Sequence, residues 1–228
     1  VQKPIAESTL VILLAQTIII SALLIFLPIY IKFRKDPEIK NIKKGKYITY
    51  FALLGLGYII IEICLIQKFT LFLGQPVYTM LTVISTMLIF SGIGSMLSDK
   101  IITKLKNVNL VYIIIAALAV ILGLTNSAIF DALVRMDIMW RVIISIGLIA
   151  PIAFFMGIPF PYGMSMIDNN QKYLVAYGWG VNGFFSVLGS VLVIMISMSY
   201  GFKVVFIISA LLYLAAMLVS GKLKPKVA

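Results

Sequence analysis

The sequence predicts an all-α integral membrane protein with seven transmembrane helices. Of its 228 residues, 62% are hydrophobic and 12% are charged, whereas a soluble domain is about half apolar and about one quarter charged. The apolar residues gather in runs long enough for a helix to cross a bilayer, which takes about 20 residues. The alternating pattern of a membrane β-strand is absent, so a β-barrel is not favoured.

Seven apolar runs are separated by turn-forming residues or by short basic segments. The runs cover residues 8–31, 48–73, 77–98, 109–126, 138–158, 174–198 and 203–220. The breaks between them carry Asp36-Pro37, Gly74-Gln75-Pro76, Asn107, Pro159-Phe160-Pro161 and Tyr200-Gly201. We expect residues 127–137 to form an external loop or an interfacial helix. The chain then divides into a leading helix at 1–33, a basic loop at 34–46, a six-helix domain at 47–221 and a basic tail at 222–228.

The positive residues predict the orientation of the chain. The net charge is +11, and the positive residues stand in short clusters between the apolar runs. Fourteen Lys and Arg residues fall in the first, third and fifth loops and the tail, and five fall on the opposite side. Because basic loops stay in the cytoplasm, the N-terminus is predicted to face outward and the C-terminus to face the cytoplasm. The clusters indicate membrane orientation and contact with anionic lipid, not nucleic-acid binding.

Several kinds of catalytic and cofactor site are excluded by composition. The chain has no His, and Cys64 is its only cysteine. A Cys/His zinc site, a His-based catalytic triad, a disulfide framework and haem ligation by imidazole are therefore excluded. We expect no enzymatic activity, no cofactor and no metal.

Glu62 is the acidic residue in the middle of a predicted span. An intramembrane carboxylate is costly and usually faces the protein interior. Tyr58 lies one helical turn before it and shares its face, so its hydroxyl is expected to reach the carboxylate. Gln67 lies partly on the same stripe, and Gly55 and Gly57 allow another helix to approach. Glu62 is then either a proton- or cation-responsive acid that lines a cavity, or a buried acid paired with a hydroxyl, an amide or a neighbouring helix.

Small residues mark two further helices as closely packed. Gly92 and Gly94 end the third run, and Gly180 and Gly183 lie near the start of the sixth. Such residues let helix backbones approach each other in a membrane. Asn182 lies among them and requires a hydrogen-bond partner.

Prolines cluster at the end of the fifth run. Pro151, Pro159 and Pro161 interrupt regular helical hydrogen bonding. Broken helices build substrate sites in some transporters. The alternative is a helix end that turns along the membrane interface.

The segment after the third run resembles the cytoplasmic loop signature of major-facilitator transporters. Asp99, Lys100 and Lys104 fall in register with that signature, while Ser95 and Ile102 stand where it has glycines. With the first span set aside, the other six resemble one half of such a transporter.

Four sequence blocks carry a family resemblance: the run from Leu54 to Tyr78, Phe90-Ser-Gly-Ile-Gly-Ser95, Phe155-Met-Gly-Ile-Pro-Phe-Pro161, and Trp179-Gly-Val-Asn-Gly183 with Ser186-Val-Leu-Gly-Ser190. Together they resemble the membrane region of bacterial spermidine-synthase-like proteins. The resemblance covers residues 48–202. It implies a prokaryotic cytoplasmic membrane and a soluble aminopropyltransferase-like or methyltransferase-like domain as a neighbour. The glycine-rich turn of such a domain is not found in this chain.

Two functional classes follow from the sequence. The first is a non-catalytic membrane subunit or anchor that assembles with a soluble synthase-like domain or with other membrane subunits. The second is a transporter-like half that moves a small cation such as a polyamine, with Glu62 as the intramembrane acid. The second class rests on the resemblance and on the polar residues within the spans.

Overall fold

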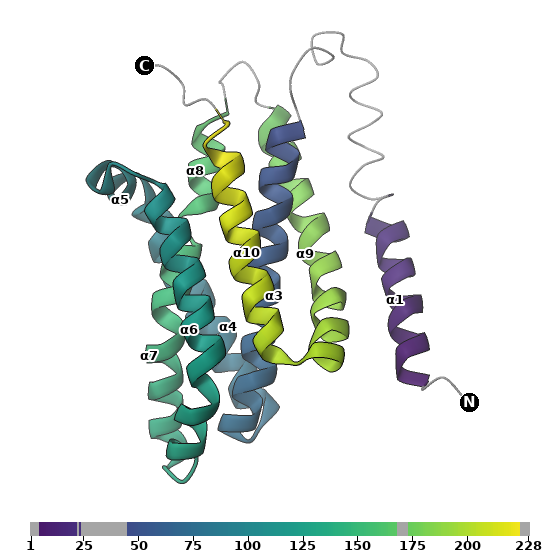
Figure 1. The fold of residues 1–228 in the computed structure, drawn as a ribbon, viewed down its shortest axis with the longest axis vertical. Helices are drawn as coiled ribbons and strands as arrows, with labels where there is room; N and C mark the ends of the chain where they lie inside the picture. Colours follow the sequence, from purple (N-terminus) through teal and green to yellow (C-terminus); the bar gives the residue numbers. More distant parts are fainter. Residues whose placement is uncertain (1–4, 22, 24–44, 168–172, 224–228) are drawn as a thin grey trace.

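The computed structural model describes residues 5–21, 23, 45–167 and 173–223, and these residues form helices and short connections, with no strand among them (Figure 1). The helices are α1 (Ile5–Ser21), α3 (Gly45–Leu73), α4 (Pro76–Met96), α5 (Ser98–Leu105), α6 (Asn109–Leu133), α7 (Ile138–Met156), α8 (Pro159–Ser165), α9 (Tyr173–Tyr200) and α10 (Phe202–Ser220). The all-helical class predicted from the sequence is confirmed.

Within this part of the chain, six helical segments are long and apolar enough to cross a membrane. They are Gly45–Leu73, Pro76–Met96, Asn109–Leu133, Ile138–Ser165, Leu174–Tyr200 and Phe202–Ser220. The multi-pass character predicted from the sequence agrees with this. Of the predicted first span at 8–31, α1 supplies the beginning and packs beside α9. Residues 22 and 24–31 lie outside the described residues, so the seventh span remains a prediction.

Helix α3 is the centre of the bundle. It packs against α9, α10 and α4, and it buries large aromatic side chains along its whole length. Those with 0–1% of their surface exposed are Tyr50, Phe51, Phe69 and Phe72. Near the end of α3, Phe72 stacks on Phe130 of α6, with ring centroids 4.5 Å apart. Helix α3 is therefore surrounded by protein, whereas α4 exposes many apolar side chains.

Two of the predicted turns use glycine for the same physical reason. Gly74 between α3 and α4 and Gly201 between α9 and α10 both have φ of +80°, a conformation that residues with a Cβ rarely adopt. Pro76 follows as the first residue of α4, a position that suits its fixed φ and missing N–H. The turn residues in the sequence therefore placed these helix ends correctly.

Helix α6 extends further than predicted. The sequence indicated an end near residue 126, but the helix continues to Leu133. Ser127 lies against the bundle and its hydroxyl accepts a hydrogen bond from Lys68 Nζ at 3.1 Å. Phe130 is buried between Phe69 and Phe72. Ser127 and Phe130 therefore lie on a face of α6 whose side chains contact α3, and the expected loop is shortened to residues 134–137.

The predicted cytoplasmic loop signature lies on a short helix. Asp99, Lys100 and Lys104 belong to α5, which ends at Leu105 and is followed by Lys106 with φ of +56°. Thr103 Oγ1 donates to the Asp99 carbonyl oxygen at 2.8 Å, within the helix. The segment is therefore ordered as an amphipathic helix instead of a loop.

The prolines near the end of the fifth span do not all interrupt the helix: the break comes after Pro151, not at it. Pro151 lies inside α7, which continues to Met156. The chain bends at Gly157 and Ile158, and α8 follows from Pro159. Pro159 is buried, and α8 contacts α3, α4 and α5. Both interpretations of the cluster, a broken helix at a substrate site and a helix end turned along the membrane interface, stay predictions.

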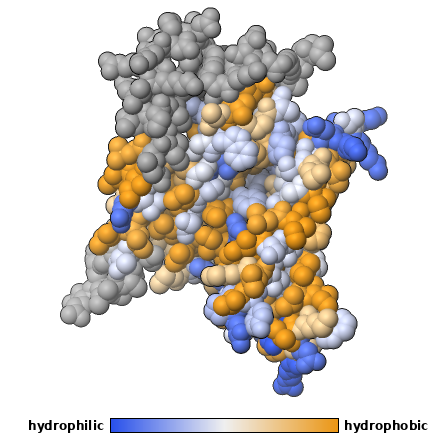
Figure 2. Space-filling view, turned by 180° about the vertical axis from the view of Figure 1, so that it is seen from behind, coloured by the Kyte–Doolittle hydropathy of each residue, from blue (hydrophilic) through white to orange (hydrophobic). Residues whose placement is uncertain are grey.

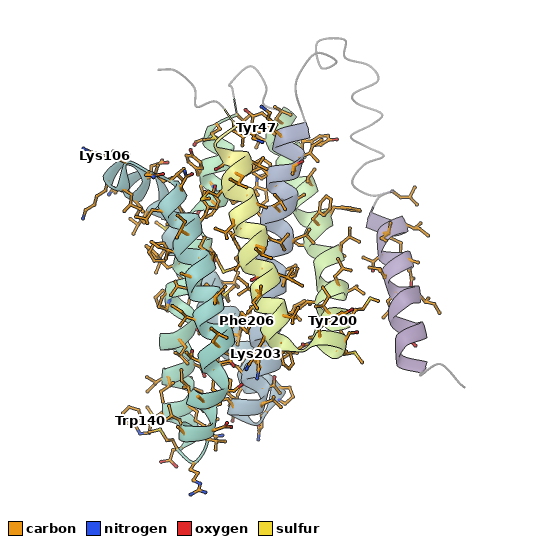
Figure 3. The ribbon with its side chains drawn as sticks, viewed as in Figure 1. Tyr47, Lys106, Trp140, Tyr200, Lys203 and Phe206 are labelled. Atoms are coloured by element: carbon orange, nitrogen blue, oxygen red, sulfur yellow. The ribbon has the colours of Figure 1, made fainter. Side chains whose placement is uncertain are left out.

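The described basic residues lie toward opposite ends of the bundle. Lys106 lies beyond α5, toward the end of the bundle where Tyr47 also lies, and Lys203 lies by the α9–α10 turn, toward the other end (Figures 1 and 3). This arrangement matches the alternation from which the orientation was predicted. The side of the membrane that each end faces remains a prediction.

Candidate functional site

A cavity of about 460 Å³ lies between the helices in the half of the bundle that carries α8. Its walls come from α3, α4, α9 and α10, with the α7–α8 break closing one side. In Figure 2, pale and moderately polar residues gather in a hollow between two orange flanks. The volume falls within the range of about 300–1,000 Å³ that small-molecule sites occupy.

Hydroxyl groups supply most of the polar chemistry of the cavity. Tyr58 of α3 and Ser91 of α4 approach each other across it, with their oxygens 3.4 Å apart. Tyr213 of α10 lines the cavity with only 1% of its surface exposed. Among the described residues its hydroxyl has no hydrogen-bond partner. Two phenol groups therefore have a weak partner or none within the described part of the chain.

The wall formed by α9 uses its polar groups to hold α3. Asn182 Nδ2 donates to the Phe51 carbonyl oxygen at 3.3 Å. Ser186 Oγ donates to the Gly55 carbonyl oxygen at 3.2 Å and to the Asn182 carbonyl oxygen at 2.9 Å. These bonds fix α9 along α3, and both side chains also line the cavity.

Aromatic rings form the rim of the cavity. Phe160 of α8 packs edge to face on Trp179 of α9, with centroids 4.6 Å apart. Trp179 is 62% exposed although it lines the cavity. Offset and edge-to-face contacts of this kind fix ring orientation. The rim therefore presents aromatic surface toward the opening.

Three of the predicted packing glycines bring the walls together. A Cβ on Gly55 would overlap the Asn182 carbonyl oxygen, and one on Gly57 would lie 2.9 Å from the Tyr213 ring. A Cβ on Gly94 would overlap the Phe154 carbonyl oxygen of α7. The close helix contacts predicted at these positions are present.

The other predicted glycines behave differently. Around Gly92 and Gly183 an added Cβ would meet nothing within 4 Å, so the predicted close packing is not found there. Gly92 instead borders the cavity. Gly180 is half-buried.

The four residues predicted as one intramembrane polar site do not meet in one place. Tyr58 and Asn182 line the cavity. Gln67 lies further along α3, where its Oε1 accepts a hydrogen bond from Ser197 of α9 at 3.2 Å. Glu62 is half-buried and lies one turn from Tyr58, but it is not among the lining residues. Within the described part of the chain, its carboxylate has no hydrogen bond and no ion pair.

Tyr213 was not predicted to be part of the site. It lies in an apolar run of α10, more than 150 residues after Tyr58. A second missed feature is a buried tyrosine pair. The hydroxyls of Tyr50 and Tyr112 are 2.7 Å apart, and Tyr50 donates to the Pro159 carbonyl oxygen at 2.6 Å. In the sequence, these tyrosines stand out only as aromatic residues with a polar hydroxyl inside apolar runs.

No cluster of three or more His, Cys, Asp or Glu side chains that could hold a metal ion occurs among the described residues. In the same residues, the walls of the cavity carry hydroxyl, amide and aromatic groups and no charged side chain. The arrangement can bind and orient a neutral molecule, but it lacks the paired acid and base of a hydrolytic site.

Comparison with known proteins gives no further identification: no family model, no curated protein and no solved structure matches the chain.

Proposed function

We propose that this chain is a non-catalytic, multi-pass membrane subunit that assembles with another membrane-embedded protein across the hollow face of its bundle. The observation that carries the proposal is the position of Glu62. Its half-buried carboxylate lies near the middle of α3 and has no partner in the described part of the chain. The sequence resemblance alone suggests that the chain lies in a prokaryotic cytoplasmic membrane and that a soluble synthase-like domain is its neighbour.

The Glu62 carboxylate requires polar partners that lipid cannot supply. Lipid tails cannot accept or donate hydrogen bonds, and a charged side chain in the bilayer centre costs about 2.5–3.5 kcal/mol or more. Leu54, Tyr58 and Glu62 follow each other at intervals of four residues, so they share one stripe of α3. The first two line the open cavity, and the stripe continues past it to Glu62. A second membrane protein over this stripe supplies the polar groups that lipid lacks.

The proposal is tested by photo-crosslinking in native membranes. A benzoylphenylalanine at Leu88, which is 63% exposed at the edge of the cavity, should form a discrete protein adduct. The matched control is Leu211 of α10, which is 58% exposed, lies outside the cavity and borders a separate apolar groove between α6 and α10; it should give lipid adducts only. Equal protein adducts at both positions, or none at Leu88, would contradict the proposed face.

A transporter-like half is the second candidate, favoured by the cavity together with the intramembrane acid. The two candidates predict different results for Glu62→Gln, which keeps the shape and the hydrogen-bonding capacity of the side chain but removes its charge. For an assembly subunit, the variant should fold and co-purify with its partner as the wild type does. For a transporter half moving a cation, uptake of labelled polyamine into proteoliposomes should be lost, with Gln67→Glu as a charge-adding comparison.

A further inference from the structure

We infer that the cavity binds a neutral, lipid-soluble molecule whose carbonyl oxygens accept hydrogen bonds from the hydroxyls of Tyr58 and Tyr213. The site is built from this chain alone, so the inference does not depend on the proposed assembly. It begins from the two tyrosines that the packing of the bundle does not use.

Tyr213 is the strongest indication of a ligand. Its side chain is 1% exposed, it lines the cavity, and its hydroxyl has no hydrogen-bond partner among the described residues. The hydroxyl is not among the fully enclosed unpaired polar atoms of the described residues, which are Asn126 Nδ2 and Arg141 Nε, so it opens to the cavity. The ring lies against Gly57, whose missing side chain leaves room for it. The hydroxyl therefore faces the cavity and is free to donate.

Tyr58 provides a second donor on the adjoining wall. Within the described residues, the one hydrogen-bond contact of its hydroxyl is with Ser91 Oγ at 3.4 Å, and Ser91 Oγ also has a long contact of 3.5 Å with the Leu88 carbonyl oxygen. Both distances exceed the usual range for O–H···O hydrogen bonds, about 2.5–3.0 Å. A ligand oxygen between the tyrosines would replace these weak contacts with better ones.

The walls define the remaining chemistry of the ligand. None of the side chains that line the cavity is charged, and aromatic and aliphatic groups predominate. An anionic ligand would find no Lys or Arg there, and the nearest carboxylate on α3, that of Glu62, is outside the lining. Exposed Trp179 and Leu88 at the rim offer apolar surface for a tail. A neutral head group with acceptor oxygens and an apolar body fits this combination.

The experiment uses Trp179 as a reporter, because quinones quench tryptophan fluorescence on contact. The chain has two tryptophans, and Trp140→Phe leaves Trp179 at the cavity as the only one. The probe is 2-decyl-1,4-naphthoquinone added to the purified full chain in lipid nanodiscs. We expect saturable quenching of Trp179. In the complementary variant Trp179→Phe, Trp140 at the far end of α7 should show only the non-saturable quenching caused by probe in the lipid (Figure 3).

The tyrosines are tested by removing single oxygen atoms. Tyr58→Phe and Tyr213→Phe should each weaken binding about five- to tenfold, the effect of one net hydrogen bond. Tyr78→Phe, at a 49% exposed residue of α4, is the matched control and should bind as the parent does. Unchanged affinity in both cavity variants would overturn the inference. Their thermal midpoints, measured in parallel, show whether a loss of binding is a loss of folding.

Competing molecules test the class of ligand. Decylnaphthalene has the same apolar body without carbonyls, and decyltrimethylammonium is a cation with the same tail. Neither should displace the quinone at equal concentration, and displacement by the cation would contradict the assignment to a neutral ligand. Monodecanoylglycerol separates two sources of the same chemistry. Displacement by it indicates an acyl ester as a natural ligand, and retention of the quinone indicates a quinone-type ring.

Discussion

Replacing Gly94 with alanine is expected to lower the stability of the bundle by about 1–3 kcal/mol, the usual cost of overpacking. The added Cβ would overlap the carbonyl oxygen of Phe154, a backbone atom that cannot rotate away. On the facing helix, a Cβ on Gly157 would overlap the Ser91 carbonyl oxygen. The two glycines therefore form one crossing of α4 and α7, and this crossing shapes one side of the cavity.

The matched control is Gly147→Ala on α7, where a new Cβ would meet nothing within 4 Å. This variant should be as stable as the wild type or slightly more stable, because alanine favours helix more than glycine does. Stability is measured by labelling Cys64, the only cysteine, which is fully buried and becomes reactive when the bundle opens. Equal midpoints for Gly94→Ala and Gly147→Ala in a thermal ramp would show that the crossing is not close-packed.

Tyr50→Phe is expected to destabilise the protein by about 1–3 kcal/mol, because its buried polar partners lose a hydrogen bond. Tyr50 is 0% exposed and donates to the Pro159 carbonyl oxygen at the start of α8. Its oxygen is also 2.7 Å from the Tyr112 hydroxyl. With only one hydroxyl hydrogen on Tyr50, the proton between the two tyrosines comes from Tyr112.

This arrangement predicts an order of effects. Tyr112→Phe removes one hydrogen bond but leaves the contact between Tyr50 and Pro159 intact, so it should cost less than Tyr50→Phe. The measurement is the same Cys64 labelling ramp, with Tyr78→Phe as the exposed control. An equal or larger loss for Tyr112→Phe would show that Tyr50 does not hold α8 through Pro159.

The long helices and their turns could be predicted from local sequence because lipid imposes a simple rule of length and hydropathy. Gly74, Pro76 and Gly201 act through their own backbone geometry, so their positions alone placed the turns. The end of α6 could not be placed in this way. Ser127 appeared to begin a loop, but its hydroxyl is paired with Lys68 of a helix about 60 residues earlier.

The candidate site depends even more on distant contacts. Glu62 and Tyr58 were predicted to interact because they are one turn apart, yet the Tyr58 hydroxyl faces Ser91 of α4. Tyr213 belongs to the cavity only because α10 packs on Gly57 of α3. Helical spacing identifies the face of one helix, whereas the partners on that face are set by how other helices cross it.

The most direct test of the proposed assembly is native mass spectrometry of the chain extracted with its surrounding lipid into nanodiscs, without detergent exchange. We predict a complex in which this chain and a second membrane protein chain, either another copy or a different subunit, occur in a fixed ratio. The same ratio should persist in the Glu62→Gln variant. A particle that contains a single copy of the chain and only lipid would contradict the assembly, because no second protein would then cover the hollow face.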